Sequence, residues 1–157
     1  DVYREPGRFF VTISTEGRRP WFRRLDVVEH CAAVLLKTCK TEGFTLAAYC
    51  FMPDHLHLLV LNETEGDWVR LIHRFKQQTG WWFRNRYAAG GLKASPISPA
   101  TRLALWQRSY YDHVLRRDED VADVVRYILD NPARAGLAES RDDYPYARSA
   151  FGLTEPA

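Results

Sequence analysis

Two apolar runs separated by only two residues constrain the fold of this chain most strongly. Phe44–Met52 and His55–Leu61 are rich in leucine and aromatic residues, and Pro53 and Asp54 between them are typical turn residues. A connection this short allows only antiparallel pairing, so the two runs predict a β-hairpin. A third run, Phe9–Ser14, is followed by the polar residues Thr15 to Gly17 and predicts an earlier strand.

Apolar residues at helical spacing predict a first helix after the first strand and a second one after the hairpin. We expect Asp26 to cap the first helix, with Glu29 completing a capping box, and Gly43 to end it. Asp67 is expected to cap the second. The apolar stripe of the second helix is predicted to consist of Trp68, Leu71, Ile72, Phe75, Thr79 and Trp82.

The C-terminal third of the chain predicts one more strand and one more helix. The Gly-, Pro- and Ser-rich segment 88–100 is expected to be a loop, and Tyr110–Leu115 a strand. Three acidic residues, 118–120, suit the positive N-terminus of a third helix, and Pro132 is expected to end that helix at Asn131. The core face of this helix is predicted to be Val121, Val124, Val125, Ile128 and Leu129.

The order β-α-β-β-α-β-α predicts a single α+β domain over residues 1–157, with an antiparallel sheet and helices packed mainly on one face. No Gly-rich phosphate loop follows a predicted strand, which disfavours a doubly wound nucleotide-binding fold. The longest apolar runs are too short to span a bilayer, and the N-terminus lacks a signal-peptide pattern. Cys31, Cys39 and Cys50 form no CxxC motif, and Cys31 and Cys39, eight residues apart on one helical face, are expected to be buried thiols in a reducing cytoplasm.

Charge is distributed unevenly although the net charge is only +2. The stretch from Trp68 to Tyr111 holds eight of the 22 basic residues, none of the 20 acidic ones, and four of the five tryptophans. Interleaved basic and aromatic residues suit single-stranded nucleic acid, because bases stack and phosphates pair with cations. The alternative is that the aromatic residues are core and the arginines are merely solvated. The predicted DNA-binding residues of this stretch are Arg70, Arg74, Lys76, Trp81, Arg84 and Arg86.

His55 and His57 form a His-x-His motif in the second strand of the hairpin. Side chains alternate along a strand, so both imidazoles are expected on one face and Leu56 on the other. Two nitrogen ligands at this spacing can hold a divalent cation and leave positions open for substrate oxygens. The alternative is a pair of hydrogen-bonded histidines in or near the core.

Tyr127 and Asn131 lie four residues apart in the third predicted helix, so their side chains share one stripe beside the apolar face. A tyrosine there can reach across the sheet surface, although tyrosines on helix flanks often only pack. Asn131, just before a proline, is also a common turn residue. The strand segment 110–113 (YYDH) offers a ligand, a proton relay or a rival nucleophilic tyrosine, or else has a purely structural role.

Together these residues outline one reaction. A divalent ion on His55 and His57, completed by Asn131, would polarise a phosphate oxygen. The Tyr127 oxygen would attack the phosphorus and form a phosphotyrosyl ester. A free phenol has a pKa near 10, so the site must assist its deprotonation, and the sequence contains no evident base for that proton. Because one phosphoester replaces another, the reaction can join strands as well as cut them.

Four segments resemble a known family. Met52–Leu59 (MPDHLHLL) resembles the His-hydrophobic-His motif of HUH single-strand DNA endonucleases, and Tyr127–Leu137 (YILDNPARAGL) resembles the tyrosine segment of their single-tyrosine, IS200-like transposase branch. Trp106–His113 (WQRSYYDH) and Gly17–Phe22 (GRRPWF) further resemble the REP-associated tyrosine transposases.

The resemblance implies a ferredoxin-like antiparallel sheet and metal-dependent cleavage and joining of single-stranded DNA. The expected intermediate is a 5′-phosphotyrosine with a free 3′-hydroxyl. It implies that His55 and His57 are metal ligands, that Tyr127 is the nucleophile and that Asn131 completes the metal site. Mg²⁺ or Mn²⁺ is the expected ion, and DNA hairpins with short flanking guide sequences, such as REP elements, are the expected substrates. Arg18 and Arg19 in the early loop are predicted to add DNA contacts, and the REP-associated branch favours a monomer over a dimer.

This chain departs from the family pattern at Asp54, where the family more often has Asn, and an extra carboxylate there is expected to alter metal affinity. Ala133 replaces a usual Val, and the tail around 144–149 matches only loosely. Two alternative functions stay open: a non-catalytic single-stranded nucleic-acid-binding module, and a mononuclear metal-dependent hydrolase that uses only His55 and His57.

Overall fold

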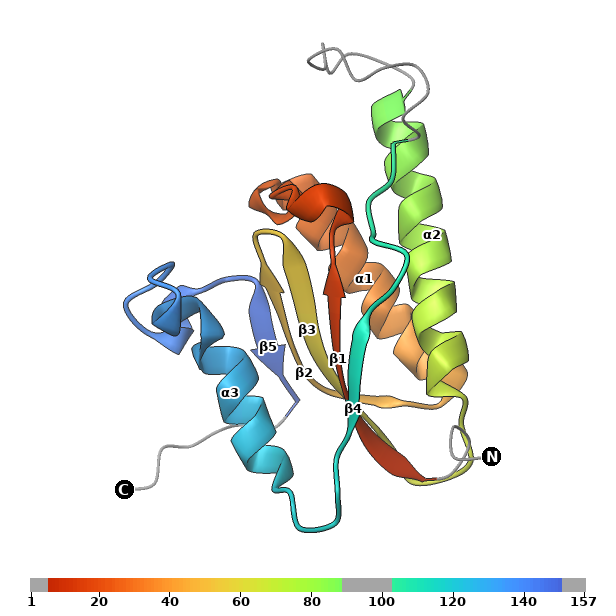
Figure 1. Cartoon of the computed structure of the whole chain (residues 1–157), viewed down its shortest axis with the longest axis vertical. Helices are drawn as coiled ribbons and strands as arrows, with labels where there is room; N and C mark the ends of the chain where they lie inside the picture. The colour runs from red at the N-terminus through yellow and green to blue at the C-terminus, as the bar shows by residue number, and fades with distance from the viewer. Residues whose placement is uncertain (1–5, 89–102, 151–157) are drawn as a thin grey trace.

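A five-stranded antiparallel sheet with the strand order β4-β1-β3-β2-β5 lies at the centre of the structure (Figure 1). The computed structural model describes residues 6–88 and 103–150. The strands are β1 (Gly7–Ser14), β2 (Thr45–Met52), β3 (His55–Asn62), β4 (Tyr111–Val114) and β5 (Ala147–Ser149). The helices are α1 (Leu25–Glu42), α2 (Trp68–Ala88) and α3 (Val121–Arg134), with short 3-10 helices η1 (Glu16–Arg18), η2 (Trp21–Arg23) and η3 (Arg141–Asp143). The predicted α+β class and antiparallel sheet are confirmed.

The predicted hairpin forms the middle of the sheet. β2 pairs with β3 and places Met52 opposite His55, so Pro53 and Asp54 make the turn as expected. β1 pairs with the other edge of β3, with Ser14 opposite His55. β5, which pairs with β2, was not predicted, because three residues are too few to show a strand pattern.

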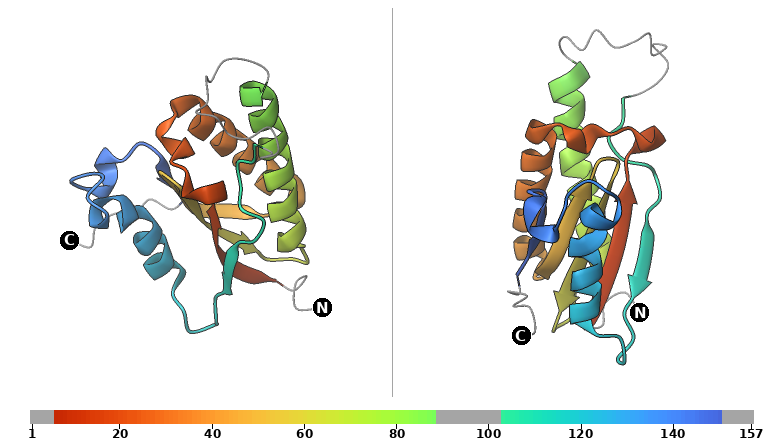
Figure 2. Two further views of the ribbon diagram at one scale, coloured as in Figure 1. Left: turned by 45° about the horizontal axis from the view of Figure 1, so that its top comes forward. Right: turned by 90° about the vertical axis from the view of Figure 1, so that its left-hand side faces the viewer.

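The two faces of the sheet pack against different helices (Figure 2). Leu56, Leu58 and Val60 of β3 belong to one buried core with side chains of α1 and α2. Leu59 belongs to a second core with Val125 and Ile128 of α3. The two long helices therefore cover one face, in agreement with the prediction of helices mainly on one side, and α3 covers the opposite one. The alternation along β3 places His55 and His57 on the α3 face.

The capping box predicted at Asp26 is wrong. α1 begins at Leu25 with Arg24 as its N-cap residue. The Asp26 carboxylate instead accepts a hydrogen bond of 2.6 Å from the Tyr87 hydroxyl, which joins the start of α1 to the end of α2. The predicted end at Gly43 is confirmed, since this residue adopts the left-handed φ of 76° that favours glycine. The Asp67 cap is also confirmed, because its Oδ1 accepts from the Arg70 amide at 2.9 Å.

The apolar stripe of α2 is confirmed except at its last position. Phe83 is fully buried, whereas Trp82 is only partly buried and stacks on His30 with a ring-centroid distance of 4.0 Å. The predicted loop 88–100 lies, apart from Ala88 at the end of α2, outside the described residues. Within the described residues, no helix combines the length and apolar character needed to cross a membrane. Cys31 and Cys39 are buried free thiols, as predicted, and Cys50 is one as well.

α3 extends beyond its predicted end. Asp120 caps it, with Oδ1 accepting from the Ala122 amide at 2.8 Å, as the acidic residues at its start suggested. Pro132 does not end the helix, which continues to Arg134. A proline removes one backbone hydrogen bond, and here that loss falls in the last turn. The buried Pro132 ring and the bond from the Ala135 amide to the Asn131 carbonyl sustain the turn.

Candidate functional site

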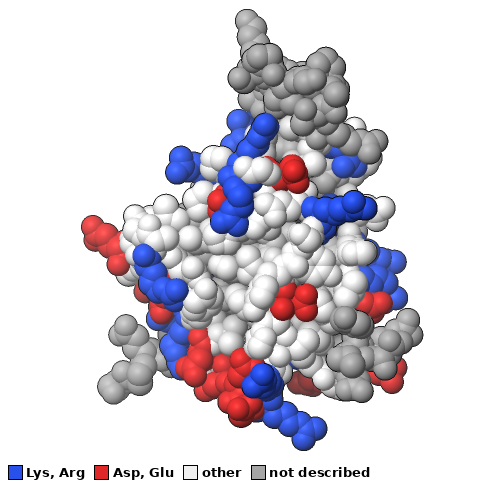
Figure 3. Space-filling view, in the orientation of Figure 1, with Lys and Arg blue, Asp and Glu red and all other residues white. Residues whose placement is uncertain are grey.

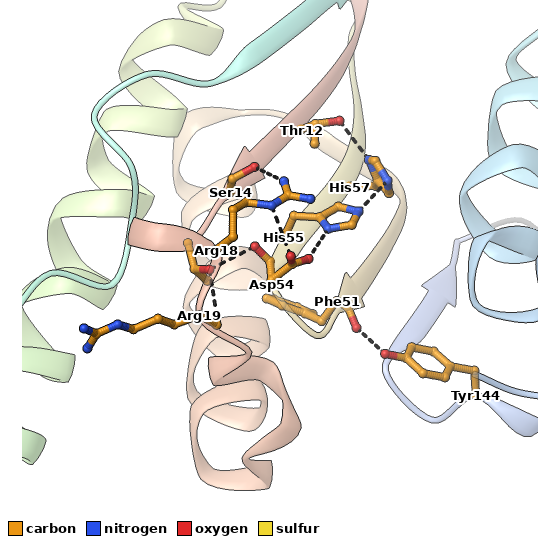
Figure 4. A network of polar contacts seen from close by, with 10 residues as sticks. Thr12, Ser14, Arg18, Arg19, Phe51, Asp54, His55, His57 and Tyr144 are labelled. Carbon is orange, nitrogen blue, oxygen red and sulfur yellow. Dashed lines mark hydrogen bonds and ion pairs between the residues drawn. The ribbon is translucent and has the colours of Figure 1, made fainter. Parts of the chain in front are cut away.

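His55 and His57 lie side by side on the α3 face of β3, with their Nε2 atoms 3.1 Å apart (Figure 4). Each opposite ring nitrogen has its own partner. His55 Nδ1 lies 2.7 Å from Asp54 Oδ1, and His57 Nδ1 lies 2.8 Å from the Thr12 hydroxyl. The contacts of the two Nδ1 atoms with Asp54 and Thr12 therefore hold the two Nε2 atoms facing one another.

This arrangement fits a divalent cation. Two ligands at right angles around an octahedral ion, with bonds of about 2.1 Å, lie about 3 Å apart. The Asp54 carboxylate accepts from His55 Nδ1–H and so leaves the lone pair of the His55 Nε2 free. The Thr12 hydroxyl can accept from His57 Nδ1–H in the same way. In the described part of the chain, no group of three or more His, Cys, Asp or Glu side chains is placed to hold a metal ion, so further ligands would be amide, water or substrate oxygens.

His57 is the more buried of the pair, with 7% of its surface exposed. Burial lowers the pKa of His57 to about 4, and the nearby His55, Arg134 and Arg18 add to this shift. The neutral imidazole, which is the form that binds metals, is thereby favoured near neutral pH.

Arg18 orients the turn before the histidines. Its Nε lies 3.1 Å from Asp54 Oδ2, and its Nη1 donates to the Ser14 hydroxyl at 2.7 Å (Figure 4). Arg18, which the sequence predicted as a DNA contact, thus binds the carboxylate that contacts the candidate metal ligand His55. The Arg19 side chain points away from this network. The roles of Thr12 and of the Arg18–Asp54 pair were missed. The alternation in the first strand, which places Thr12 and Ser14 on one face, was the available indication.

Tyr127 of α3 lies against His57 although the two are seventy positions apart in the sequence. The centroid of its ring is 6.1 Å from that of His57 and 5.9 Å from that of Phe10. The Arg134 guanidinium carbon lies 4.7 Å from the Tyr127 ring centroid. With 41% of its surface exposed, Tyr127 is accessible to a substrate. The fold therefore brings an accessible phenol next to the His57 imidazole, whose Nε2 faces that of His55.

Comparison with known proteins decides the family. Residues 8–131 match the model of the family described as "Transposase IS200 like". The chain belongs to the IS200-like transposases. The predicted resemblance to tyrosine transposases, which are enzymes, is confirmed by this match and by the relatives below.

Three similar proteins illustrate the IS200-like family membership. A protein of Haemophilus influenzae assigned to the REP-associated tyrosine transposases is 28% identical over 152 residues, which cover 90% of this chain and 78% of the relative. The REP-associated tyrosine transposase of Escherichia coli is 24% identical over 148 residues, with 92% and 78% covered. A solved REP-associated tyrosine transposase bound to a REP hairpin superposes with a TM-score of 0.68 at 21% identity, with 92% and 78% covered. The last comparison shows a shared fold.

Asn131 of this IS200-like chain lies one helical turn beyond Tyr127. Its Nδ2 donates to the Tyr127 carbonyl at 2.9 Å, which leaves its Oδ1 as the atom that can bind a ligand. The predicted role of Asn131 in a metal site stays a prediction.

The other tyrosines near the site differ in the face they occupy. Tyr110 packs against Trp68, with ring centroids 6.0 Å apart, and belongs to the core of α1 and α2. Tyr111 lies opposite Thr12 on the α3 face and is 61% exposed. His113 pairs with Glu119 at 2.8 Å. Tyr111 is therefore the stronger rival nucleophile, but it makes no ring contact with His57 within the described residues.

The predicted DNA-binding residues of α2 differ in how far they are already paired. Arg70 and Arg74 contact the buried carboxylate of Glu42 at 2.8 and 2.6 Å. Lys76 donates to the carbonyls of Gln107 and Arg108 at 2.8 and 3.0 Å. These bonds link α2 to the segment that precedes β4. Arg86 lies 3.8 Å from Asp26.

Two residues of the basic stretch are better placed for an external partner. Trp81 is 63% exposed, and Arg84, one turn later, is exposed and makes no ion pair within the described residues. Figure 3 shows basic side chains towards the end of the molecule that holds η1 and the C-terminal half of α2. Acidic ones gather at the opposite end, where α3 begins. A DNA strand is therefore more favoured near Trp81 and Arg84 than near the start of α3.

Asp54→Asn is expected to weaken Mn²⁺ binding about tenfold. A neutral amide oxygen accepts the His55 Nδ1–H more weakly than a carboxylate, and the ion pair with Arg18 is lost as well. Isothermal titration with Mn²⁺ measures this change. Asp112→Asn, at an exposed carboxylate of β4, is the matched control. Equal Mn²⁺ affinity of the wild type and Asp54→Asn would show that the carboxylate does not tune this site.

Proposed function

We propose that this protein is a metal-dependent single-stranded DNA endonuclease and transposase that cleaves and rejoins DNA beside hairpins through a 5′-phosphotyrosine intermediate. The observation that carries the proposal is the contact between the Tyr127 ring and His57, whose Nε2 faces the Nε2 of His55. This contact places the candidate nucleophile next to two nitrogens that can hold a metal ion, which are the groups that metal-assisted phosphoryl transfer to tyrosine uses.

In the proposed cleavage step, the Tyr127 oxygen attacks the phosphorus of the scissile phosphodiester and the phenolic proton is released. The bond from phosphorus to the 3′-oxygen breaks, that oxygen takes up a proton, and the 5′-phosphate stays on Tyr127. The 3′-hydroxyl of another strand can then attack the phosphotyrosine, which joins the DNA and frees the tyrosine. The number of phosphoesters is unchanged throughout, so no energy-rich cofactor is needed.

We propose His55, His57 and Asn131 as the residues that hold Mg²⁺ or Mn²⁺. The chemistry that such an ion supplies when bound is polarisation of a non-bridging phosphate oxygen. Thr12 and Asp54 keep the imidazole Nδ1 atoms engaged, so that the Nε2 lone pairs are available. Burial keeps His57 neutral for the same purpose.

The proposed substrate is single-stranded DNA that carries a hairpin, in line with the REP hairpin bound by the structurally similar transposase. We also propose that the protein acts as a monomer in the cytoplasm. The support for a monomer is that one chain supplies both the His55–His57 pair and the Tyr127 that contacts His57, so the site needs no tyrosine helix from a second copy.

The test is incubation of the protein with labelled hairpin DNA and Mg²⁺ or Mn²⁺. We expect a DNA–protein adduct that survives SDS, and no adduct in EDTA. DNA binding without an adduct, across metals and hairpins, would favour the non-catalytic binding module. Cleavage without any protein-linked product would favour the hydrolase that uses water.

Trp81→Ala is expected to weaken binding of a hairpin with single-stranded flanks about tenfold, because stacking of one base on an exposed aromatic ring is lost. Trp81→Phe keeps an aromatic face and is expected to retain most of the affinity. Fluorescence anisotropy with labelled DNA measures both variants. If Trp81→Ala bound the hairpin with wild-type affinity, Trp81 would not be part of the DNA-binding surface.

A further inference from the structure

Arg134, in the last turn of α3, is a cation beside the proposed nucleophile without an anionic partner in the described residues. Its guanidinium lies over the Tyr127 ring, 4.7 Å from the ring centroid, and its side chain is exposed. Other arginines around the site are engaged by carboxylates: Arg18 by Asp54, and Arg141 by Asp130 at 2.8 Å. Arg134 thus keeps its hydrogen-bonding edge for a ligand.

The position of Arg134 depends on the continuation of α3 through Pro132. Arg134 follows Tyr127 by seven residues, which is two helical turns, so both side chains share one stripe of the helix. An end of the helix at Asn131 would have removed Arg134 from this stripe.

The Tyr127 ring is a neighbour of both Arg134 and His57. Its centroid is 4.7 Å from the Arg134 guanidinium and 6.1 Å from the His57 ring. A phosphate that is attacked by Tyr127 next to His57 therefore lies within the field of this guanidinium.

We propose that Arg134 is a catalytic residue that binds the non-bridging oxygens of the scissile phosphate while Tyr127 attacks. This inference rests on the proposed function and adds a phosphate-binding group to it. Guanidinium groups present two parallel N–H donors that match phosphate oxygens, and such charge-assisted bonds exceed an exposed cation–π contact in strength. The negative charge on these oxygens is concentrated as the phenol oxygen approaches, so Arg134 stabilises the transition state more than the bound substrate.

The test is the single-turnover rate of adduct formation at saturating hairpin DNA and Mn²⁺. Arg134→Gln is expected to lower this rate about 100-fold, and Arg134→Lys about tenfold, because an ammonium group provides the charge without the paired donors. Arg126→Gln removes the same charge from the same helix, at a side chain paired with Asp123, and should stay within about twofold of the wild type. Mn²⁺ affinity and the Kd for the hairpin should change less than about threefold in Arg134→Gln, since the residue acts mainly in the transition state.

A hairpin with a methylphosphonate at the scissile position separates a phosphate-binding role from a structural one. This substrate replaces one charged oxygen by a methyl group, so it needs less positive charge in the site. The rate deficit of Arg134→Gln should shrink on it from about 100-fold to less than about fivefold. An equal deficit on both substrates, or a wild-type rate on the phosphate, would overturn the role of Arg134. Absence of any adduct in the wild type would instead overturn the proposed function itself.

Discussion

Replacement of Tyr127 by Phe is expected to abolish the covalent DNA adduct, with a fall in its rate of at least about 1,000-fold. Only the phenol oxygen is removed, and this oxygen is the proposed attacking atom. The ring that packs against Phe10 and His57 stays in place, so the fold and the position of α3 should be preserved. Denaturing electrophoresis of the reaction with labelled hairpin DNA measures the adduct, and hairpin affinity should match the wild type.

Tyr111→Phe is the matched control for this variant, because Tyr111 is also exposed on the α3 face, opposite Thr12. It is expected to form the adduct at close to the wild-type rate. An adduct that persists in Tyr127→Phe and disappears in Tyr111→Phe would move the nucleophile from α3 to β4.

His57→Ala is expected to remove detectable Mn²⁺ binding and to lower adduct formation at least about 100-fold. The variant loses one of the two facing Nε2 atoms, and in the described residues no third His, Cys, Asp or Glu is placed to bind the same ion. Mn²⁺ should raise the Tm of the wild type, because a ligand that binds only the folded state stabilises it, and should leave the Tm of His57→Ala unchanged.

His113→Ala is the control for the loss of an imidazole, since His113 lies on β4 and pairs with Glu119. Its Mn²⁺ response is expected to equal that of the wild type. A cavity at position 57 lowers stability by itself, so the comparison uses the shift caused by Mn²⁺ in each variant and not the absolute Tm. Wild-type adduct formation in EDTA would contradict the metal site.

Local patterns predicted most of the fold, and long-range contacts caused the errors. The hairpin of β2 and β3 follows from two apolar runs and a two-residue turn, which only neighbouring residues determine. The capping box at Asp26 failed because the Tyr87 hydroxyl, 61 positions away, engages that carboxylate. The prediction that Pro132 ends α3 is wrong because the proline ring is buried, and this burial offsets the lost hydrogen bond.

The sequence predicted the motifs of the candidate site one by one, but not how their side chains are placed relative to one another. Strand alternation was enough to place His55 and His57 on one face. That Tyr127 meets them depends on α3 docking through Val125 and Ile128 onto that same face, which no local pattern encodes. The contacts of Asp54 with Arg18 and of Tyr127 with Arg134 likewise follow from the η1 turn and the extended end of α3.

Mass spectrometry of the proteolysed adduct tests the central claim most directly. The protein is incubated with Mn²⁺ and a hairpin DNA, and the peptide attached to the DNA and the ends of the cleaved strand are identified. The account predicts that the 5′-phosphate is linked to the peptide that contains Tyr127, and that the released fragment ends in a 3′-hydroxyl. Attachment at another residue, or cleaved DNA that carries no peptide, would contradict it.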